Sequence, residues 1–211
     1  MIIAVDGPAA SGKGTIARAL AAHYSLPHLD TGMLYRAVGL SVARAGGNPD
    51  NEAEAFEACG FANALLADPE LRSEATGTLA SRVSIHPAVR GALVKRQRDF
   101  ANQPGGAVLD GRDIGTVIAP GADVKLFVTA SPEMRALRRM RELQQRELPA
   151  DFDALVADIR ARDERDMNRP IAPLKQAIGA ALLDTSDLSI EAAVRQAIAL
   201  VDAQVEGQKT D

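Results

Sequence analysis

The sequence is poor in residues that form covalent cross-links or bind zinc. Cys59 is the only cysteine among 211 residues, so an intramolecular disulfide and a cysteine-rich zinc site are both excluded. The three histidines are His23, His28 and His86, and their spacing matches no metal-binding motif. We therefore expect a fold that depends on its hydrophobic core, with Cys59 as a small buried residue of a helix.

Long apolar runs and a positively charged leader are also missing. No run approaches the roughly 18 apolar residues of a membrane-spanning helix. The residues after Met1 include no basic region and no cleavage site. The net charge is −4, from 24 basic and 28 acidic residues, which argues against a general polyanion-binding protein. We expect a cytoplasmic chain that binds neither membranes nor nucleic acids, and a local anion site is compatible with this composition.

Lysine is scarce, whereas arginine is abundant and unevenly placed. The chain has 5 lysines and 19 arginines, and nine of the arginines fall within residues 131–169. The same segment has nine acidic residues and no lysine, so it is not a basic tail. Arginines placed singly in this way suit bidentate recognition of phosphate groups. A solvated helical hairpin with ion pairs one turn apart is the alternative.

The order of apolar and amphipathic segments predicts an α/β fold. Short continuous apolar runs alternate with helical segments, which is typical of a parallel sheet covered by helices on both faces. The predicted strands are residues 2–6, 27–29, 107–110, 124–128 and 181–184. The predicted helices are residues 14–24, 31–45, 87–102, 131–147, 151–167 and 190–205, with Thr31 capping the second and Ser131 opening the fourth. We expect one domain, residues 1–211, with five strands.

Residues 46–86 have a weaker pattern. Residues 52–67 have helical composition, and residues 68–85 are predicted to be helical with a break at Gly77. Residues 47–68 show no pair of alternating segments, so no β-hairpin is predicted there.

Four of the predicted strands end in polar residues. Asp6, Asp30, Asp110 and Asp184 each stand at a carboxyl end and are followed by a glycine or a hydroxyl residue. In parallel α/β sheets these ends lie at one edge, where ligands bind. The sequence therefore predicts a polar binding site at this edge.

A glycine-rich loop follows the first predicted strand. Residues 7–15 read GPAASGKGT and fit the phosphate-binding pattern G-x-x-x-x-G-K between a buried strand and a helix. Gly7 and Gly12 allow successive N–H groups to face an anion, and Lys13, which we expect to be exposed, reaches the β- and γ-phosphates. Gly14 separates Lys13 from the hydroxyl of Thr15, whereas the strict pattern has Ser or Thr directly after the lysine. A plain strand–helix turn with an exposed lysine is the alternative.

Charged residues follow two other strands. Asp110 ends an apolar run and suits a Mg²⁺ ion held through waters, although Asp-Gly is also common in turns. Arg36 lies about one turn inside the helix that follows the second strand, either at the site or in solvent. Arg112 and Asp113 form either a weak surface ion pair or two halves of a substrate-reading element.

Six motifs extend over nearly the whole chain in order. They are DGPAASGKGT (residues 6–15), DTGMLYR (30–36), ASRV with PAVR (80–83 and 87–90), KRQRDF (95–100), DGRDIGT (110–116) and RDERDMNRPIAPL (162–174). In this order they resemble the bacterial-type cytidylate kinases, which transfer the γ-phosphoryl group of ATP to CMP or dCMP. The resemblance implies the P-loop nucleoside monophosphate kinase fold, a Mg²⁺ cofactor and a monomer.

The resemblance also implies roles for individual residues. The ATP-binding residues are Gly7, Ala9, Ala10, Ser11, Gly12, Lys13, Gly14, Thr15, Arg138 and Arg139, the last two in a mobile lid. The CMP-binding residues are Thr31, Arg36, Ser81, Arg90, Arg112, Asp113, Arg162, Asp166 and Arg169. Among these, Ser81, Arg90 and Asp113 read the base, Arg36 and Arg112 clamp the phosphate, Asp166 contacts the sugar, and Arg162 and Arg169 close on the phosphates. Lys13, Arg112 and Arg169 are the expected catalytic residues, and Thr15 and Asp110 the expected Mg²⁺ residues.

The resemblance divides the chain into regions. Residues 31–102 correspond to the monophosphate-binding region, with a helical insert shorter than in many members, and residues 131–169 correspond to the lid.

Two other functions remain open. Another P-loop kinase would share residues 7–15 but has no need for Ser81, Arg90 and Asp113. A nucleotide-binding switch would have no use for a second set of arginines.

Overall fold

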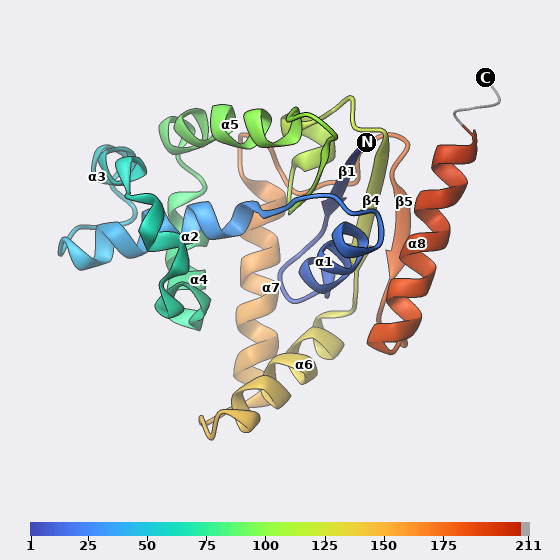
Figure 1. The fold of residues 1–211 in the computed structure, drawn as a ribbon. Helices are drawn as coiled ribbons and strands as arrows, with labels where there is room; N and C mark the ends of the chain where they lie inside the picture. Colours follow the sequence, from blue (N-terminus) through green and yellow to red (C-terminus); the bar gives the residue numbers. More distant parts are fainter. Residues whose placement is uncertain (208–211) are drawn as a thin grey trace.

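The computed structural model describes residues 1–207, which form a five-stranded sheet with helices on both faces (Figure 1). The strands are β1 (Ile2–Asp6), β2 (His28–Asp30), β3 (Ala107–Gly111), β4 (Val124–Thr129) and β5 (Ala181–Asp184). Their order is β2-β3-β1-β4-β5, and every neighbouring pair is parallel. The predicted fold class is confirmed, and β2 begins one residue later than predicted.

Successive residues of the strands fill two cores on opposite faces of the sheet. Ile3 and Val5 of β1 pack with residues of α1 (Lys13–His23) and α8 (Ile190–Gly207). Ala4 lies between them and packs on the other face with Ile114, the first residue of a π-helical turn. Because both faces are covered, alternation of apolar and polar residues is lost, and the strands become continuous apolar runs.

Residues 31–102 form a helical lobe beside the sheet (Figure 1). Its main helices are α2 (Thr31–Arg44), α3 (Glu52–Glu57), α4 (Glu74–Val83) and α5 (Pro87–Ala101). Leu34, Val38, Val83 and Leu93 belong to a separate buried core of this lobe. All of these residues are described, and none forms a strand, in agreement with the predicted helical insert.

The segment predicted as one helix over residues 52–67 is divided. Helix α3 ends at Glu57, and two 3₁₀ turns follow, Ala58–Gly60 and Asn63–Ala67. Cys59 lies in the first turn, is partly buried and donates its thiol proton to the Ala55 carbonyl at 3.4 Å. Helical composition therefore did not produce a continuous helix, because tertiary packing overrides weak local propensity.

The predicted break at Gly77 and the predicted cap at Thr31 are wrong. Helix α4 continues through Gly77, and the break lies at Ser73, whose hydroxyl accepts a hydrogen bond from Thr76 N–H at 3.1 Å. Thr31 is the first residue of α2, after Asp30 at the cap position. Its hydroxyl instead donates to the Asp110 carbonyl at 2.8 Å and so joins the ends of β2 and β3.

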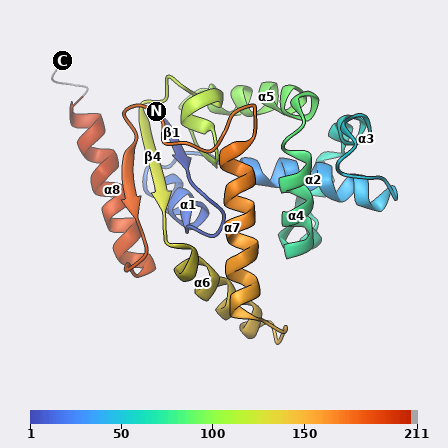
Figure 2. The same ribbon diagram turned by 180° about the vertical axis from the view of Figure 1, so that it is seen from behind.

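Two packed helices extend away from the sheet. Helix α6 (Pro132–Gln145) begins after Ser131, whose side chain caps it as predicted by accepting from Met134 N–H at 3.2 Å. Helix α7 (Phe152–Asn168) returns and runs between the sheet and the helical lobe (Figure 2). Within residues 1–207, no helix is long and apolar enough to cross a bilayer.

Candidate active site

A cavity of about 420 Å³ lies where the carboxyl ends of β1, β2 and β3 meet α4, α5 and α7. It brings together most of the residues that the sequence predicted as a site. These are Ala9, Ala10, Lys13, Gly14, Thr31, Arg36, Ser81, Arg90, Asp110, Arg112, Asp113, Arg139, Arg162, Asp166 and Arg169. Five predicted residues, Gly7, Ser11, Gly12, Thr15 and Arg138, do not line this cavity.

The loop between β1 and α1 has the geometry of a phosphate-binding loop. A side chain at Gly7 would place its Cβ 2.0 Å from the Val128 carbonyl oxygen, so only glycine lets the loop pass β4. Gly12 has φ +88° and Ala10 has φ +58°, both left-handed. Alternating backbone conformations of this kind turn successive N–H groups toward one point, where an anion binds.

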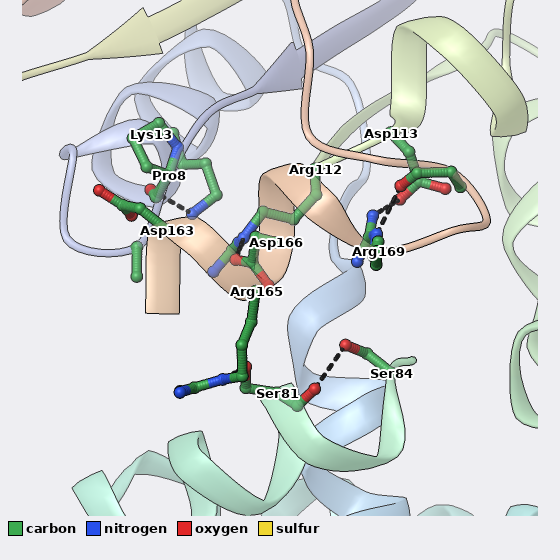
Figure 3. A network of polar contacts seen from close by, with 12 residues as sticks. Pro8, Lys13, Ser81, Ser84, Arg112, Asp113, Asp163, Arg165, Asp166 and Arg169 are labelled. Carbon is green, nitrogen blue, oxygen red and sulfur yellow. Dashed lines mark hydrogen bonds and ion pairs between the residues drawn. The ribbon is translucent and has the colours of Figure 1, made fainter. Parts of the chain in front are cut away.

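Lys13 begins α1 and is partly buried, which corrects the expectation of an exposed lysine. Its Nζ donates to the Pro8 carbonyl at 3.3 Å (Figure 3). Burial, together with the positive charge of Arg112, lowers the pKa of Lys13 to about 8. The charges of Asp110 and Asp30 act in the opposite direction without offsetting this effect, so the amine suits a phosphate as a further counter-charge.

Two carboxylates lie beside Lys13 at the ends of β2 and β3. Burial and the nearby charge of Asp110 raise the pKa of Asp30. Asp110 is 3% exposed, and its Oδ1 lies 2.7 Å from His28 Nε2. His28 was not among the predicted site residues, and nothing in its sequence context indicates this contact.

The residues around Asp110 fit a Mg²⁺ ion. Its Oδ2 faces the phosphate-binding loop, 3.6 Å from where a Gly14 side chain would begin. Carboxylate oxygens are preferred ligands of Mg²⁺, which proteins hold through one or two carboxylates, waters and substrate phosphates. No group of three metal-ligating side chains is found among the described residues. This donor set therefore suits an ion that binds together with a nucleotide.

Arg36 reaches from α2 to the residues just before α4. Its Nη1 donates to the carbonyls of Leu71 at 2.7 Å and Ser73 at 2.8 Å, and burial lowers its pKa. A side chain at Gly77 would lie 2.8 Å from Arg36 Nη2. Gly77 thus leaves room for the Arg36 guanidinium beside α4 and does not break the helix.

Asp113 lies between two buried arginines. Arg90 Nη2 makes a short contact with one carboxylate oxygen, and Arg169 Nη2 lies 3.3 Å from the other (Figure 3). All three residues are at most 6% exposed. Arg90 also lies 5.5 Å from the centre of the Tyr35 ring. The alternative of a surface pair between Asp113 and its neighbour Arg112 is wrong.

Arg112 pairs instead with Asp166 of α7 (Figure 3). Arg112 Nε donates to Asp166 Oδ2 at 2.6 Å. Burial alone raises the pKa of Asp166, but Arg112 and Arg162 reverse this and lower it. Arg162 has a buried Nε without a partner among the described residues, and burial next to Arg112 lowers its pKa to about 10. This part of the cavity has more positive charge than its carboxylates neutralise, so it suits an anion.

Asp6 holds the segment that carries Arg112 and Asp113. Its carboxylate accepts the N–H groups of Ile114 and Gly115, both at 2.8 Å, and burial raises its pKa to about 7. Asp6, predicted as a polar residue at the end of β1, thus anchors the loop that follows β3. The sequence analysis missed this structural role.

The two arginines predicted for a lid, Arg138 and Arg139, point to different places. Arg138 donates to the hydroxyl of Thr185 at 3.1 Å and contacts the Ser11 carbonyl at 3.5 Å, beside the phosphate-binding loop. Arg139 reaches the helical lobe, where it pairs with Glu74, and it also pairs with Glu142 at 2.8 Å. Arg165, not predicted individually, lies 3.4 Å from the Ser81 hydroxyl.

Comparison with known proteins agrees with this geometry. The family model described as cytidylate kinase matches residues 3–203. The chain belongs to this family. Proteins named cytidylate kinase from Rhodopseudomonas palustris (strain TIE-1) and Xanthobacter autotrophicus are 57% and 56% identical to it. The alignments cover 99% of this chain in both cases, and 99% and 100% of the relatives.

The fold also has a structural counterpart among distant proteins. The crystal structure of an uncharacterized protein from Eubacterium ventriosum ATCC 27560 is 16% identical, with a TM-score of 0.58. The match covers 96% of this chain and 98% of the other. At this identity it supports the α/β architecture alone.

Proposed function

We propose how this chain performs the reaction of its family, the transfer of the γ-phosphoryl group of ATP to CMP or dCMP. One observation carries the proposal: Lys13 of the phosphate-binding loop and the arginines of a second anion site line a single cavity. Phosphoryl transfer requires positioning and neutralisation of charge more than covalent chemistry from the protein. A cavity with two anion sites is suited to this task.

The loop side binds ATP. The backbone N–H groups of Gly7 and of residues 9–15, at the start of α1, bind the phosphates, and Lys13 neutralises the transferring group. Arg138 stands beside the same loop and approaches the nucleotide from the lid. Asp110 and Thr15 would hold Mg²⁺, which, when bound with ATP, neutralises charge on the phosphates.

The opposite side binds the acceptor nucleotide. Arg36 and Arg112 clamp its phosphate, and Arg162 and Arg169 close on the phosphates. Asp166 contacts the sugar, which requires it to share or exchange its ion pair with Arg112. Ser81, Arg90 and Asp113 read the cytosine, and Thr31 completes this side through its contact with the Asp110 carbonyl. The ion pairs with Asp113 and Asp166 thus hold these arginines in place for the nucleotide.

The helices α6 and α7 act as the lid, residues 131–169. Closing them over both nucleotides excludes water and so prevents hydrolysis of ATP. Arg139 already joins this lid to the first residue of α4 through Glu74. This contact supports the division into a lid and a monophosphate-binding region, residues 31–102, within one domain.

A coupled assay of ADP release tests the proposal against the two alternatives. The purified chain is given ATP and Mg²⁺ with CMP, UMP, AMP or shikimate as acceptor. We expect rapid release with CMP alone among these, and a loss on the order of 100-fold or more in Lys13→Ala. ATP binding without ADP release would indicate a switch, and release with another acceptor would indicate a different P-loop kinase.

We also propose that the chain acts as a monomer in the cytoplasm, where its nucleotide substrates are made and used. Lys13 and all nine acceptor-side residues line one cavity within a single chain, so this cavity holds both anion sites. Light scattering at assay concentration should give the mass of one chain, 22.2 kDa. A stable dimer mass would overturn the monomer.

A further inference from the structure

Arg135 is a buried arginine that no predicted role includes. It is the fourth residue of α6 and is 2% exposed. Its guanidinium contacts three separate elements. Nε donates to the Ala130 carbonyl at 2.9 Å, before α6. Nη1 donates to the Ala9 carbonyl at 3.1 Å, in the phosphate-binding loop, and both Nη atoms donate to the carboxylate of Asp163 on α7.

The contact with Ala9 controls a peptide group of the phosphate-binding loop. The C=O of Ala9 and the N–H of Ala10 belong to one planar trans peptide, so they point in opposite directions. Arg135 draws the carbonyl to its own side, and the N–H of Ala10 is turned away from it. Ala10 has φ +58°, which an alanine adopts only when its surroundings impose it. Both alanines line the cavity beside Lys13.

The contact with Asp163 orients the helix that carries the acceptor-binding residues. Arg135 and Asp163 form a forked pair with side chains that are 3% and 14% exposed. Figure 3 shows Asp163 on the side of α7 next to Pro8, and both residues line a second cavity behind the loop. Arg162 and Asp166, on either side of Asp163 in the sequence, line the active-site cavity. The planar guanidinium of Arg135 binds the Asp163 carboxylate through two parallel hydrogen bonds, which restrains rotation of α7 more than a single ammonium group would.

We propose that Arg135 is a positioning residue that holds the Ala9–Ala10 peptide in its phosphate-binding orientation and ties this loop to α7 through Asp163. The inference rests on the proposed function, because it assumes that ATP phosphates bind this loop. Arg135 touches neither substrate. It acts through the backbone of Ala9 and Ala10 on the donor side and through Asp163 on the acceptor side.

Arg135→Lys is the central test, because lysine keeps the charge for Asp163 and lacks the fork that also reaches Ala9. We expect this variant to stay folded and to have a lower kcat than the parent. It should bind a non-hydrolysable ATP analogue about tenfold more weakly, because a charge-assisted hydrogen bond is lost. The KM for CMP should stay within about threefold of the parent, since Asp163 remains paired. Asp163→Asn leaves the Ala9 contact and should have the smaller effect on analogue affinity.

Arg160→Met is the matched control. Arg160 of α7 pairs with Glu133 of α6 at 2.6 Å, so this variant removes an exposed ion pair between the same two helices without touching the loop. We expect its analogue affinity and kcat to equal those of the parent. If Arg135 only fastened the two helices, Arg135→Lys would lose thermal stability and keep its affinity for the analogue, and the proposal would be overturned.

The parent enzyme separates this inference from the proposed function. Failure of the parent to bind the analogue or to phosphorylate CMP would refute the proposed function. A parent that does both, with an Arg135→Lys variant indistinguishable from it in analogue affinity and kcat, would refute the positioning role alone. Thermal denaturation of each variant shows that the kinetic comparison is made between folded proteins.

Discussion

Base selection at Asp113 gives the sharpest test of the acceptor site. Cytosine has an amine donor beside a ring-nitrogen acceptor, whereas uracil has a carbonyl beside an N–H donor. A carboxylate accepts from the amine, and the guanidinium of Arg90 donates to the ring nitrogen. Both contacts become mismatched with uracil. A mismatched buried polar group costs about 1–3 kcal/mol, so two of them predict a preference for CMP of roughly 100- to 10,000-fold.

The structure shows how much of the Asp113 carboxylate is free to read a base. A carboxylate has about four acceptor positions, and the two buried arginines, Arg90 and Arg169, take one on each oxygen. The remaining positions are available for the amine. In Asp113→Asn, only one oxygen remains, and the amide N–H₂ replaces the other as a donor. We expect kcat/KM for CMP to fall about 10- to 100-fold, since a hydrogen bond to a charged group contributes about 1.5–3 kcal/mol.

The same substitution has an effect on stability that must be measured beside it. Removing one partner of a buried ion pair costs about 3–5 kcal/mol, and asparagine keeps one of the two contacts, so the loss should be smaller than this. Urea denaturation of parent and variant establishes the temperature and conditions at which both are folded. The kinetic assay is then run under those conditions.

The assay compares kcat/KM for CMP and UMP in three proteins. The amide of Asp113→Asn donates to the uracil carbonyl, so the CMP to UMP ratio should narrow by about tenfold or more. Asp158→Asn removes the same charge from an exposed residue at the rim of the cavity, and its ratio should not change. A folded Asp113→Asn protein with an unchanged ratio would refute base reading by Asp113.

Three further predictions concern protonation, the division between the two sites, and packing. The pKa of Lys13 is about 8 in the free site and rises when a phosphate binds. Calorimetry of ATP-analogue binding to the parent at pH 8 should therefore show uptake of about half a proton, and this uptake should be missing in Lys13→Met. The affinity of the parent for the analogue should fall as the pH rises above 8. Arg112→Ala should lose activity and keep its ATP-analogue affinity within a few-fold, whereas a large loss would assign Arg112 to the donor site. Gly39→Ala should destabilise the protein by about 1–3 kcal/mol in urea denaturation, because its Cβ would lie 2.8 Å from Leu79 Cβ. Gly91→Ala, with open space around it, should instead stabilise by about 0.5–1 kcal/mol; equal effects at the two glycines would refute the packing argument.

The amino-acid sequence alone was sufficient for the sheet and the phosphate-binding loop. Burial on both faces turns each strand into a continuous apolar run, and this pattern is local enough to locate all five strands. Residues 7–15 identify their own chemistry because glycine, lysine and the following helix are neighbours in the chain. All nine predicted acceptor residues also line one cavity, since parallel strands place their carboxyl ends at one edge.

The tertiary structure decided which charges meet. Arg112 and Asp113 are adjacent in sequence, yet they pair with Asp166 on α7 and Arg90 on α5, because successive side chains leave the backbone in different directions. Gly77 was predicted as a helix break, whereas in the structure it lies inside α4 and faces the Arg36 guanidinium from α2. Arg135 likewise contacts Ala9 and Asp163, which are distant from it in the sequence. Spacing along the chain encodes periodicity and local turns, whereas the partner of a buried arginine depends on helices that pack from distant segments.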